Sequence, residues 1–129
     1  MGMIVGVAEA GVPDHLKGRV GFMNHDLFEP QTVLADVYLF RMVLCNWCDN
    51  YAAKILKAQI PALRPGPEVF VQDACMPEPD AVPLWRERYL DEWKALLAMT
   101  DERFVLHQVF VPKNSLLTIL EIHWEERDI

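Results

Sequence analysis

The sequence lacks the glycine-rich turn that joins a strand to a helix in nucleotide-type α/β domains. Such a turn lets backbone N–H groups approach a cofactor closely at a helix N-terminus. The glycines of this chain never form the pattern G-x-G-x-x-G or G-x-G-x-G. We therefore expect the usual cofactor cradle to be absent. The six glycines are Gly2, Gly6, Gly11, Gly18, Gly21 and Gly66.

Long apolar runs and basic clusters are also missing. No stretch approaches the ~20 apolar residues that span a membrane. Residues 1–15 have no basic segment ahead of the apolar ones, so they do not resemble a signal peptide. The net charge of −7 and the scattered basic residues argue against nucleic acid as a partner. We expect a cytoplasmic protein without a membrane partner.

The length of 129 residues fits one domain that spans residues 1–129. The hydrophobic content of 52% is high, which indicates an apolar cavity or a subunit interface. The three cysteines are an odd number, which argues against a disulfide framework. Cys45 and Cys48 have the spacing of a redox pair or half of a zinc site, but zinc needs two more ligands. We expect no metal, and inert buried thiols at Cys48 and Cys75.

Apolar periodicity predicts an α/β fold. Helices are expected at 49–60, where Asp49 is a good N-cap, and at 84–98, after a short helix or helix remnant in 4–17. The sheet is expected to be mostly parallel, with one antiparallel strand that follows a hairpin-like turn at 112–115. The expected strands are 20–26, 35–44, 68–73, 104–110 and 116–124.

Several motifs, in order along the chain, resemble fungal small-molecule O-methyltransferases. These belong to the class I group that depends on S-adenosylmethionine (SAM) and is related to plant caffeate-type enzymes. The matching segments are the third-strand region at 18–31, a strand and loop at 36–49, the stretch 71–88 and the last strand at 116–124. The resemblance covers nearly the whole chain and implies a partial Rossmann-like methyltransferase sheet flanked by helices.

The chain departs from this family at three places. The family's opening half, which carries the glycine-rich strand and binds most of the SAM, has no counterpart here. The family's histidine, the general base, is replaced by Cys45, followed by Asn46. A thiol with a pKa near ~8.5 is a poor substitute for an imidazole near ~6.5. The helix that lines the family's acceptor site is shortened between 85–88 and 93–96. We therefore expect a truncated domain that uses no SAM.

The resemblance also implies roles for three residues. Asp26 matches a contact on the adenine side of SAM, and Trp47 matches an aromatic side chain beside the cofactor. Asp73 matches the acid that orients the missing histidine. Asp26 could instead cap a strand end, and Trp47 could belong to the core. Asp73 ends a parallel strand, at the edge where such sheets bind ligands.

The first functional hypothesis is a natural-product tailoring enzyme that transfers no methyl group. It would catalyse a cyclisation, isomerisation, dehydration or pericyclic reaction, which needs shape and a few polarising groups rather than a cofactor. The ligand would be a small hydrophobic substrate. The expected catalytic residues are Asp73, His25, Arg41 and Asn46. The expected substrate-binding residues are Tyr38, Trp47, Met76, Trp85 and Trp93, for which a plain core position is the alternative.

Two other hypotheses remain open. The chain could be a pseudoenzyme or partner subunit of a methyltransferase, or a methyltransferase half completed by another chain. In the family's strand order, 3-2-1-4-5-7-6, the loss of strands 1 and 2 exposes one edge of strand 35–44. Strand 20–26 could cover that edge, as could a second copy or a different chain. We favour a homodimer, with segment 3–17 exchanged or packed at the interface.

Overall fold

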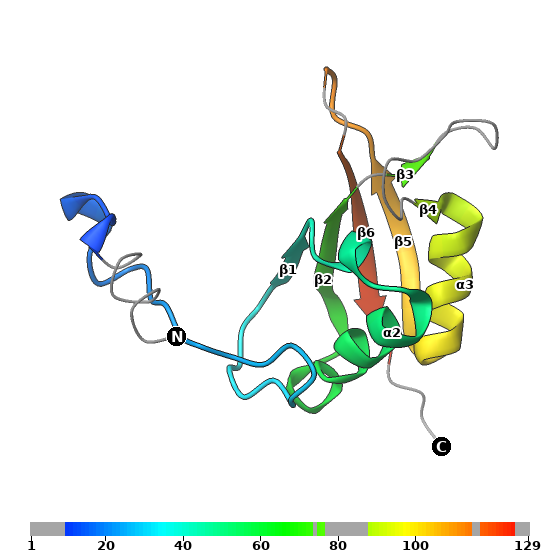
Figure 1. Ribbon diagram of the computed structural model, residues 1–129, viewed down its shortest axis with the longest axis horizontal. Coiled ribbons are helices and arrows are strands. Elements are labelled where there is room, and N and C mark those ends of the chain that lie inside the picture. Colours follow the sequence, from blue (N-terminus) through cyan, green and yellow to red (C-terminus); the bar gives the residue numbers. More distant parts are fainter. Residues whose placement is uncertain (1–9, 74, 77–87, 115–116, 126–129) are drawn as a thin grey trace.

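The main sheet has four strands in the order β1 (Tyr38–Arg41), β2 (Gly66–Asp73), β6 (Thr118–Trp124) and β5 (Phe104–Phe110) (Figure 1). The computed structural model describes residues 10–73, 75–76, 88–114 and 117–125. β1 is parallel to β2, and β6 is antiparallel to both of its neighbours. β6 is therefore the one strand that opposes the other three. This confirms the expected α/β sheet, and the order matches the 4-5-7-6 half of the family's sheet.

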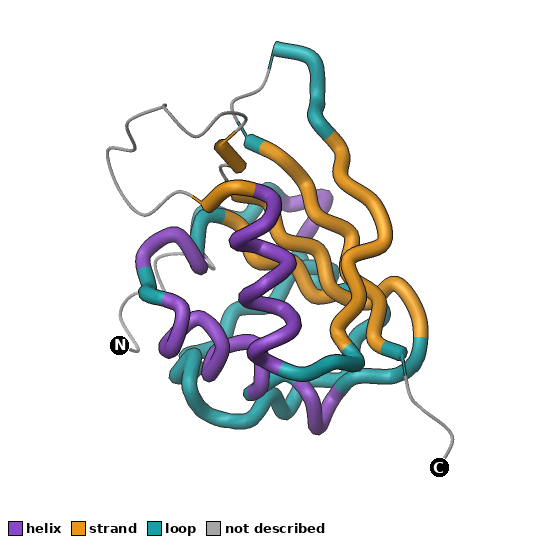
Figure 2. Tube along the Cα trace, turned by 90° about the vertical axis from the view of Figure 1, so that its right-hand side faces the viewer, coloured by secondary structure: helices purple, strands orange, loops and turns teal. Residues whose placement is uncertain are grey.

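The helices α2 (Asp49–Lys57) and α3 (Leu90–Thr100) lie on one face of this sheet (Figure 2). Two short strands, β3 (Cys75–Met76) and β4 (Arg88–Tyr89), form a separate parallel pair. Short 3-10 helices occur at η1 (Asp14–Leu16), η2 (Leu44–Asn46) and η3 (Ile60–Ala62). Among the described residues, no helix is long and apolar enough to cross a membrane.

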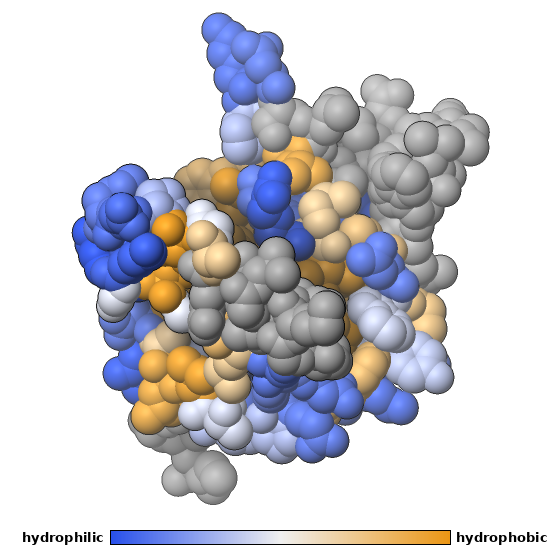
Figure 3. All heavy atoms as spheres, turned by 60° about the vertical axis from the view of Figure 1, so that its left-hand side comes forward, coloured by the Kyte–Doolittle hydropathy of each residue, from blue (hydrophilic) through white to orange (hydrophobic). Residues whose placement is uncertain are grey.

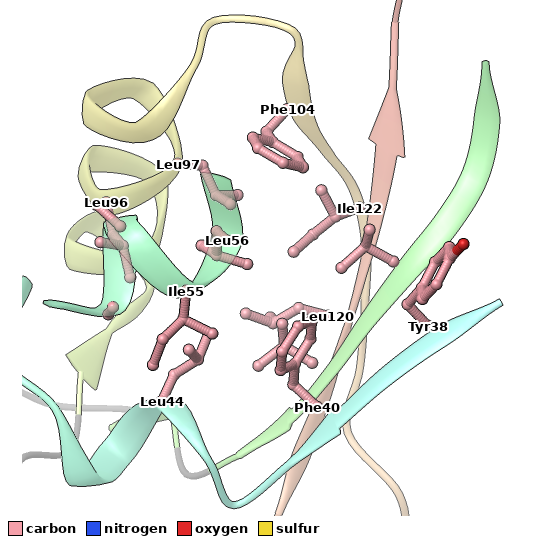
Figure 4. Packing of buried hydrophobic residues seen from close by; sticks show 14 of the residues in the cluster. Tyr38, Phe40, Leu44, Ile55, Leu56, Leu96, Leu97, Phe104, Leu120 and Ile122 are labelled. Carbon is pink, nitrogen blue, oxygen red and sulfur yellow. The ribbon is translucent and has the colours of Figure 1, made fainter. Parts of the chain in front are cut away.

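The core lies between the sheet and the two helices. Alternate residues of β6 are buried, so that Leu120 and Ile122 face the helices. Ile55 and Leu56 of α2 and Leu96 of α3 meet them from the other side (Figure 4). The helices bury these residues because apolar positions recur at helical spacing along one stripe. This packing holds the ends of β1 and β2 in place, where the candidate site lies.

Two expected strands differ from the structure. Residues 20–26 form no strand, and among the described residues β1 pairs only with β2. A strand needs a neighbour for its backbone hydrogen bonds, and the segment before β1 extends away from the sheet (Figure 1). The strand expected at 35–44 is limited to Tyr38–Arg41 because Met42 adopts a φ of 55°, which turns the chain out of the sheet.

The expected helix 84–98 begins later than its sequence suggests. Tyr89 stands at the N-cap of α3 and forms a capping box with Glu92, so the helix starts at Leu90. Residues 84–87 lie outside the described residues.

At α2, Cys48 occupies the N-cap and Asp49 the first helical position. Cys48 is exposed, so the expectation of a buried thiol there is wrong. The side chain of Cys75 is outside the described part.

Candidate functional site

The loop after β1 is held against the end of β2 by a buried carboxylate. Asp73 is the last residue of β2, and its side chain is almost fully buried. Its Oδ2 accepts a hydrogen bond from the backbone N–H of Cys45, with an N–O distance of 3.1 Å. The register pairs Arg41 with Gln72, so Asp73 lies just past the end of β1. The carboxylate thus fixes the loop that carries Cys45, Asn46 and Trp47.

Cys45 cannot replace a histidine base in this setting. Burial raises the pKa of its thiol above the ordinary value, and the negative charge and hydrogen bond of Asp73 raise it further. The thiol is therefore protonated at neutral pH and is a poor proton acceptor. The neighbouring Asn46 is exposed, and its Nδ2 donates to the carbonyl of Met42 at 3.3 Å. The loop thus presents an amide and a neutral thiol.

Arg88 holds the other side of the same loop and is fully buried. Its guanidinium donates to the carbonyl oxygens of Leu44 at 2.9 Å and Trp47 at 2.7 Å. It also forms an ion pair with Asp49 at 3.0 Å. In the sequence, Arg88 is part of the family-like stretch 71–88, and no separate role is expected of it. A buried arginine needs partners. The partners of Arg88 lie about forty residues away in the chain, so the sequence alone does not reveal them.

A cavity of about 390 Å³ opens beside this loop. The rings of Phe28 and Trp47 meet edge to face, with their centroids 5.1 Å apart. Asp26 accepts a hydrogen bond from the N–H of Phe28 at 2.9 Å, which holds its carboxylate in the turn. His25 Nε2 is buried and has no hydrogen-bond partner among the described residues. The cavity is lined by Asn24, His25, Asp26, Leu27, Phe28 and Trp47.

The structure brings part of the predicted site together. His25, Asp26 and Trp47 share the cavity, and the loop that carries Trp47 also carries Asn46 and contacts Asp73. Arg41 ends β1 at this side of the sheet and is exposed.

The other predicted residues lie elsewhere. Tyr38 begins β1, at the opposite end of the strand, and its hydroxyl donates to the carbonyl of Val33 at 2.8 Å. Trp93 is buried in the core. Trp85 and the side chain of Met76 lie outside the described residues. The cavity therefore gathers the groups on the expected cofactor side, while Tyr38 and Trp93 are packed among core residues.

Comparisons with known proteins identify the family of this chain. The family model of the O-methyltransferase domain matches residues 1–103, and the chain belongs to this family. The chain is 36% identical to O-methyltransferase kk1A of Curvularia clavata, over 92% of this chain and 32% of that protein. It is 38% identical to the grayanic acid biosynthesis cluster O-methyltransferase of Cladonia grayi, over 92% of this chain and 30% of that protein. The chain thus spans about a third of the length of these curated relatives.

Solved structures share the fold. The structure of LepI in complex with SAM superposes with a TM-score of 0.78 at 22% identity, over 96% of this chain and 34% of LepI. LaPhzM gives a TM-score of 0.75 at 27% identity, over 93% of this chain and 38% of LaPhzM. A structure described as a pericyclic reaction enzyme also reaches 0.78, at 22% identity and with coverage of 96% and 34%.

The expectation that SAM has no part in this protein is wrong. The family to which the chain belongs depends on SAM, and neighbours of the same fold are complexes with SAM or S-adenosylhomocysteine. The missing glycine-rich turn therefore does not exclude SAM from a member of this family. The cavity's aromatic pair and His25 Nε2, which has no partner in the part of the chain that the structure describes, fit an aromatic ligand with hydrogen-bonding groups.

Proposed function

We propose that this chain binds the adenosine end of SAM in the cavity lined by His25, Asp26, Phe28 and Trp47. The observation that carries the proposal is the buried Nε2 of His25, which has no hydrogen-bond partner among the described residues and lies in a cavity with an aromatic wall. A buried polar atom without a partner is costly, and a ligand that hydrogen-bonds to it removes that cost. The resemblance of Asp26 and Trp47 to cofactor-side positions of the family supports the same ligand.

The side chains of the cavity would act in different ways. Trp47 and Phe28 supply apolar surface for a flat ring system. Asp26 offers a carboxylate whose orientation is fixed by the N–H of Phe28. Arg88 acts indirectly, since its hydrogen bond to the Trp47 carbonyl positions that residue. If bound there, SAM would offer an activated methyl group, which the reaction proposed next does not use.

The reaction proposed for the protein is the tailoring of a small natural product without methyl transfer. The support is the neutral, buried thiol of Cys45 at the position of the family's base. Without an imidazole there, a hydroxyl acceptor loses its route to deprotonation. Cyclisation, isomerisation, dehydration and pericyclic reactions need positioning and polarisation instead. Asp73, Asn46 and Arg41 are the polar groups that this end of the sheet offers.

Methyl transfer by a larger assembly is the second candidate. The curated relatives are named O-methyltransferases and are about three times as long as this chain. A second polypeptide or a longer chain would supply the remaining sheet and an acceptor base. In that case this chain contributes the adenosine cavity only.

Calorimetric titration with S-adenosylhomocysteine tests the proposed cavity. We expect the wild-type chain to bind the ligand, and Asp26→Asn and Trp47→Leu each to weaken binding at least ~10-fold, since each removes a specific contact. Asp36→Asn is the matched control, because Asp36 is an exposed aspartate outside the cavity. Equal affinity in all four proteins would contradict the assignment of the cavity.

Transfer of label from methyl-labelled SAM to a phenolic acceptor tests the reaction. We expect no transfer by the wild-type chain, and transfer by Cys45→His, whose imidazole would stand beside Asp73. The larger side chain in a buried position costs about 1–3 kcal/mol, so circular dichroism must show that the variant is folded. Label transfer by the wild-type chain would overturn the non-methylating proposal and favour the second candidate.

We also propose that the chain assembles as a homodimer through the side of β1. Among the described residues, β1 has no strand on its outer edge. Apolar side chains gather on this side of the molecule, as orange patches between polar ones (Figure 3). The exposed apolar residues before and within β1 are Val20, Phe22, Met23, Phe28, Val33, Leu34, Val37 and Leu39. A surface of this kind favours association.

A further inference from the structure

Three ligand-type side chains lie together on the sheet face that α2 and α3 leave uncovered. Residues of β6 alternate between buried and half-buried, and Leu120 and Ile122 point to the core. Glu121 and His123 therefore point to the opposite face. In Figure 2 the two helices lie on the core side of the strands only. This face is also separate from the cavity that we assign to SAM.

A second histidine, His107, lies at a β-bulge on the same face. The register pairs Leu106 with Ile122 and Gln108 with Glu121, so His107 is the extra residue of β5. The rings of His107 and His123 are stacked, with centroids 4.0 Å apart and an angle of 11° between their planes. Leu106 pairs with the buried Ile122, so the next residue, His107, has its side chain on the uncovered face beside Glu121 and His123.

The donor atoms lie close enough together for side-chain rotation to bring them around one metal ion. One donor atom each from His107, Glu121 and His123 all lie within 4.8 Å of one another. His123 Nε2 and Glu121 Oε2 are 2.7 Å apart. Bonds of about 2.0–2.2 Å to zinc in a tetrahedron place the donors about 3.3 Å apart. The lone pairs of the two stacked imidazoles lie in nearly parallel planes, so one ring has to turn before both can bind one ion. His107 is exposed and has room to turn.

We propose that His107, Glu121 and His123 bind one divalent transition-metal ion of the zinc type. Two imidazoles and one carboxylate are donors that suit zinc rather than magnesium or calcium, which take oxygen ligands. The ion would link β5 to β6 across the bulge and keep one coordination position for water. An ion pair between Glu121 and His123 explains two of the three groups. It gives no reason for the second imidazole stacked beside them.

Titration of untagged protein with cobalt(II), followed by its visible absorption, tests this site. We expect one saturable cobalt site that zinc displaces. His107→Gln and His123→Gln should each weaken cobalt binding more than ~10-fold. Removal of a residue that only hydrogen-bonds to a metal ligand already costs about that much, and these two residues are ligands themselves. The matched control is His15→Gln, which removes an exposed histidine elsewhere. Cys48→Ser controls for the exposed thiol. Both controls should bind cobalt as the wild-type chain does.

Thermal unfolding with and without zinc provides the second readout. A metal that binds only the folded state raises the melting temperature by mass action. We expect this rise in the wild-type chain and in His15→Gln, and its loss in the two site variants. Equal cobalt affinity in the wild-type chain and His107→Gln would overturn the site. Loss of binding in Cys48→Ser would assign the metal to the cysteine loop instead.

Discussion

Arg88 is a single buried side chain that connects three parts of the candidate site. It contacts η2 through Leu44, the cavity wall through Trp47 and the start of α2 through Asp49. Its guanidinium also lies over the ring of Trp93, 5.2 Å from the ring centre. Within the loop, the N–H groups of Asn46 and Trp47 donate to nearby carbonyls. Arg88 and Asp73 connect the loop to the rest of the fold.

Replacement of Arg88 by methionine should therefore destabilise the chain strongly. The substitution leaves buried carbonyl groups without donors, and we expect a loss of about 3 kcal/mol in the free energy of unfolding. Urea denaturation measures it. Arg64→Met is the matched control, because its ion pair with Asp36 is exposed and should be worth less than ~1 kcal/mol. Equal losses in both variants would show that the loop does not depend on Arg88.

Cys45 should react slowly with alkylating reagents. Burial and the charge of Asp73 raise the pKa of its thiol, so less thiolate is present at pH ~8 than an ordinary thiol provides. We expect Cys48, which is exposed, to be alkylated first in a peptide-resolved mass-spectrometric assay. Asp73→Asn removes the charge and should speed the alkylation of Cys45. A Cys45 rate equal to that of Cys48 in the wild-type chain would contradict this environment.

The turn between α3 and β5 depends on a charged pair. Asp101 accepts hydrogen bonds from the Arg103 side chain at 2.8 and 3.0 Å and from its backbone N–H at 2.9 Å. These contacts, first of all the side-chain hydrogen bond, lower the pKa of Asp101. Because the pKa is lowered in the folded state, the stabilisation is present above the unfolded pKa of about 3.9. It is lost as the pH falls through the folded value.

Asp101→Asn should therefore flatten the pH dependence of stability below pH ~4. The pair is partly exposed, so we expect a difference of less than ~1 kcal/mol between pH ~6 and pH ~3. Urea denaturation at a series of pH values provides the measurement. Arg103→Met should give the same flattened curve. If the Asp101→Asn curve runs parallel to that of the wild-type chain, the pair does not contribute.

Strong apolar periodicity made most elements predictable. Strands 68–73, 104–110 and 116–124 and the helix at 49–60 agree with β2, β5, β6 and α2 to within a few residues. The failures have local causes. The apolar run 20–26 has strand composition but no partner strand. The start of α3 is set by a capping box whose N-cap is tyrosine, an unusual choice.

The candidate site was only partly predictable, since its contacts connect distant segments. The family resemblance pointed to Asp26, Trp47 and Asp73, and the structure places them around one loop and cavity. Nothing in the sequence pairs Arg88 with the loop more than forty residues earlier. The relation of His107 to His123 was also hidden, because it depends on which residues of β5 and β6 pair with each other. The absent glycine turn led to a wrong expectation about SAM.

The whole chain should self-associate through the side of β1 if the proposed dimer is correct. Sedimentation velocity over a range of micromolar concentrations should show a mass that rises toward twice the monomer. Leu34→Glu with Leu39→Glu should shift the equilibrium toward the monomer, since both side chains are exposed on that side. Val111→Glu is a control in the exposed turn after β5. A constant monomeric mass would exclude the homodimer.

The most direct test of the adenosine cavity is a titration of isotope-labelled protein with S-adenosylhomocysteine, followed by amide and indole N–H resonances. This measurement detects even millimolar affinity, which suits a chain about a third as long as its relatives. We predict saturable shifts of the Trp47 indole and of the amides of His25 and Phe28, while the core indoles of Trp93 and Trp124 stay in place. Unchanged Trp47, His25 and Phe28 resonances at millimolar ligand would contradict the proposed cavity.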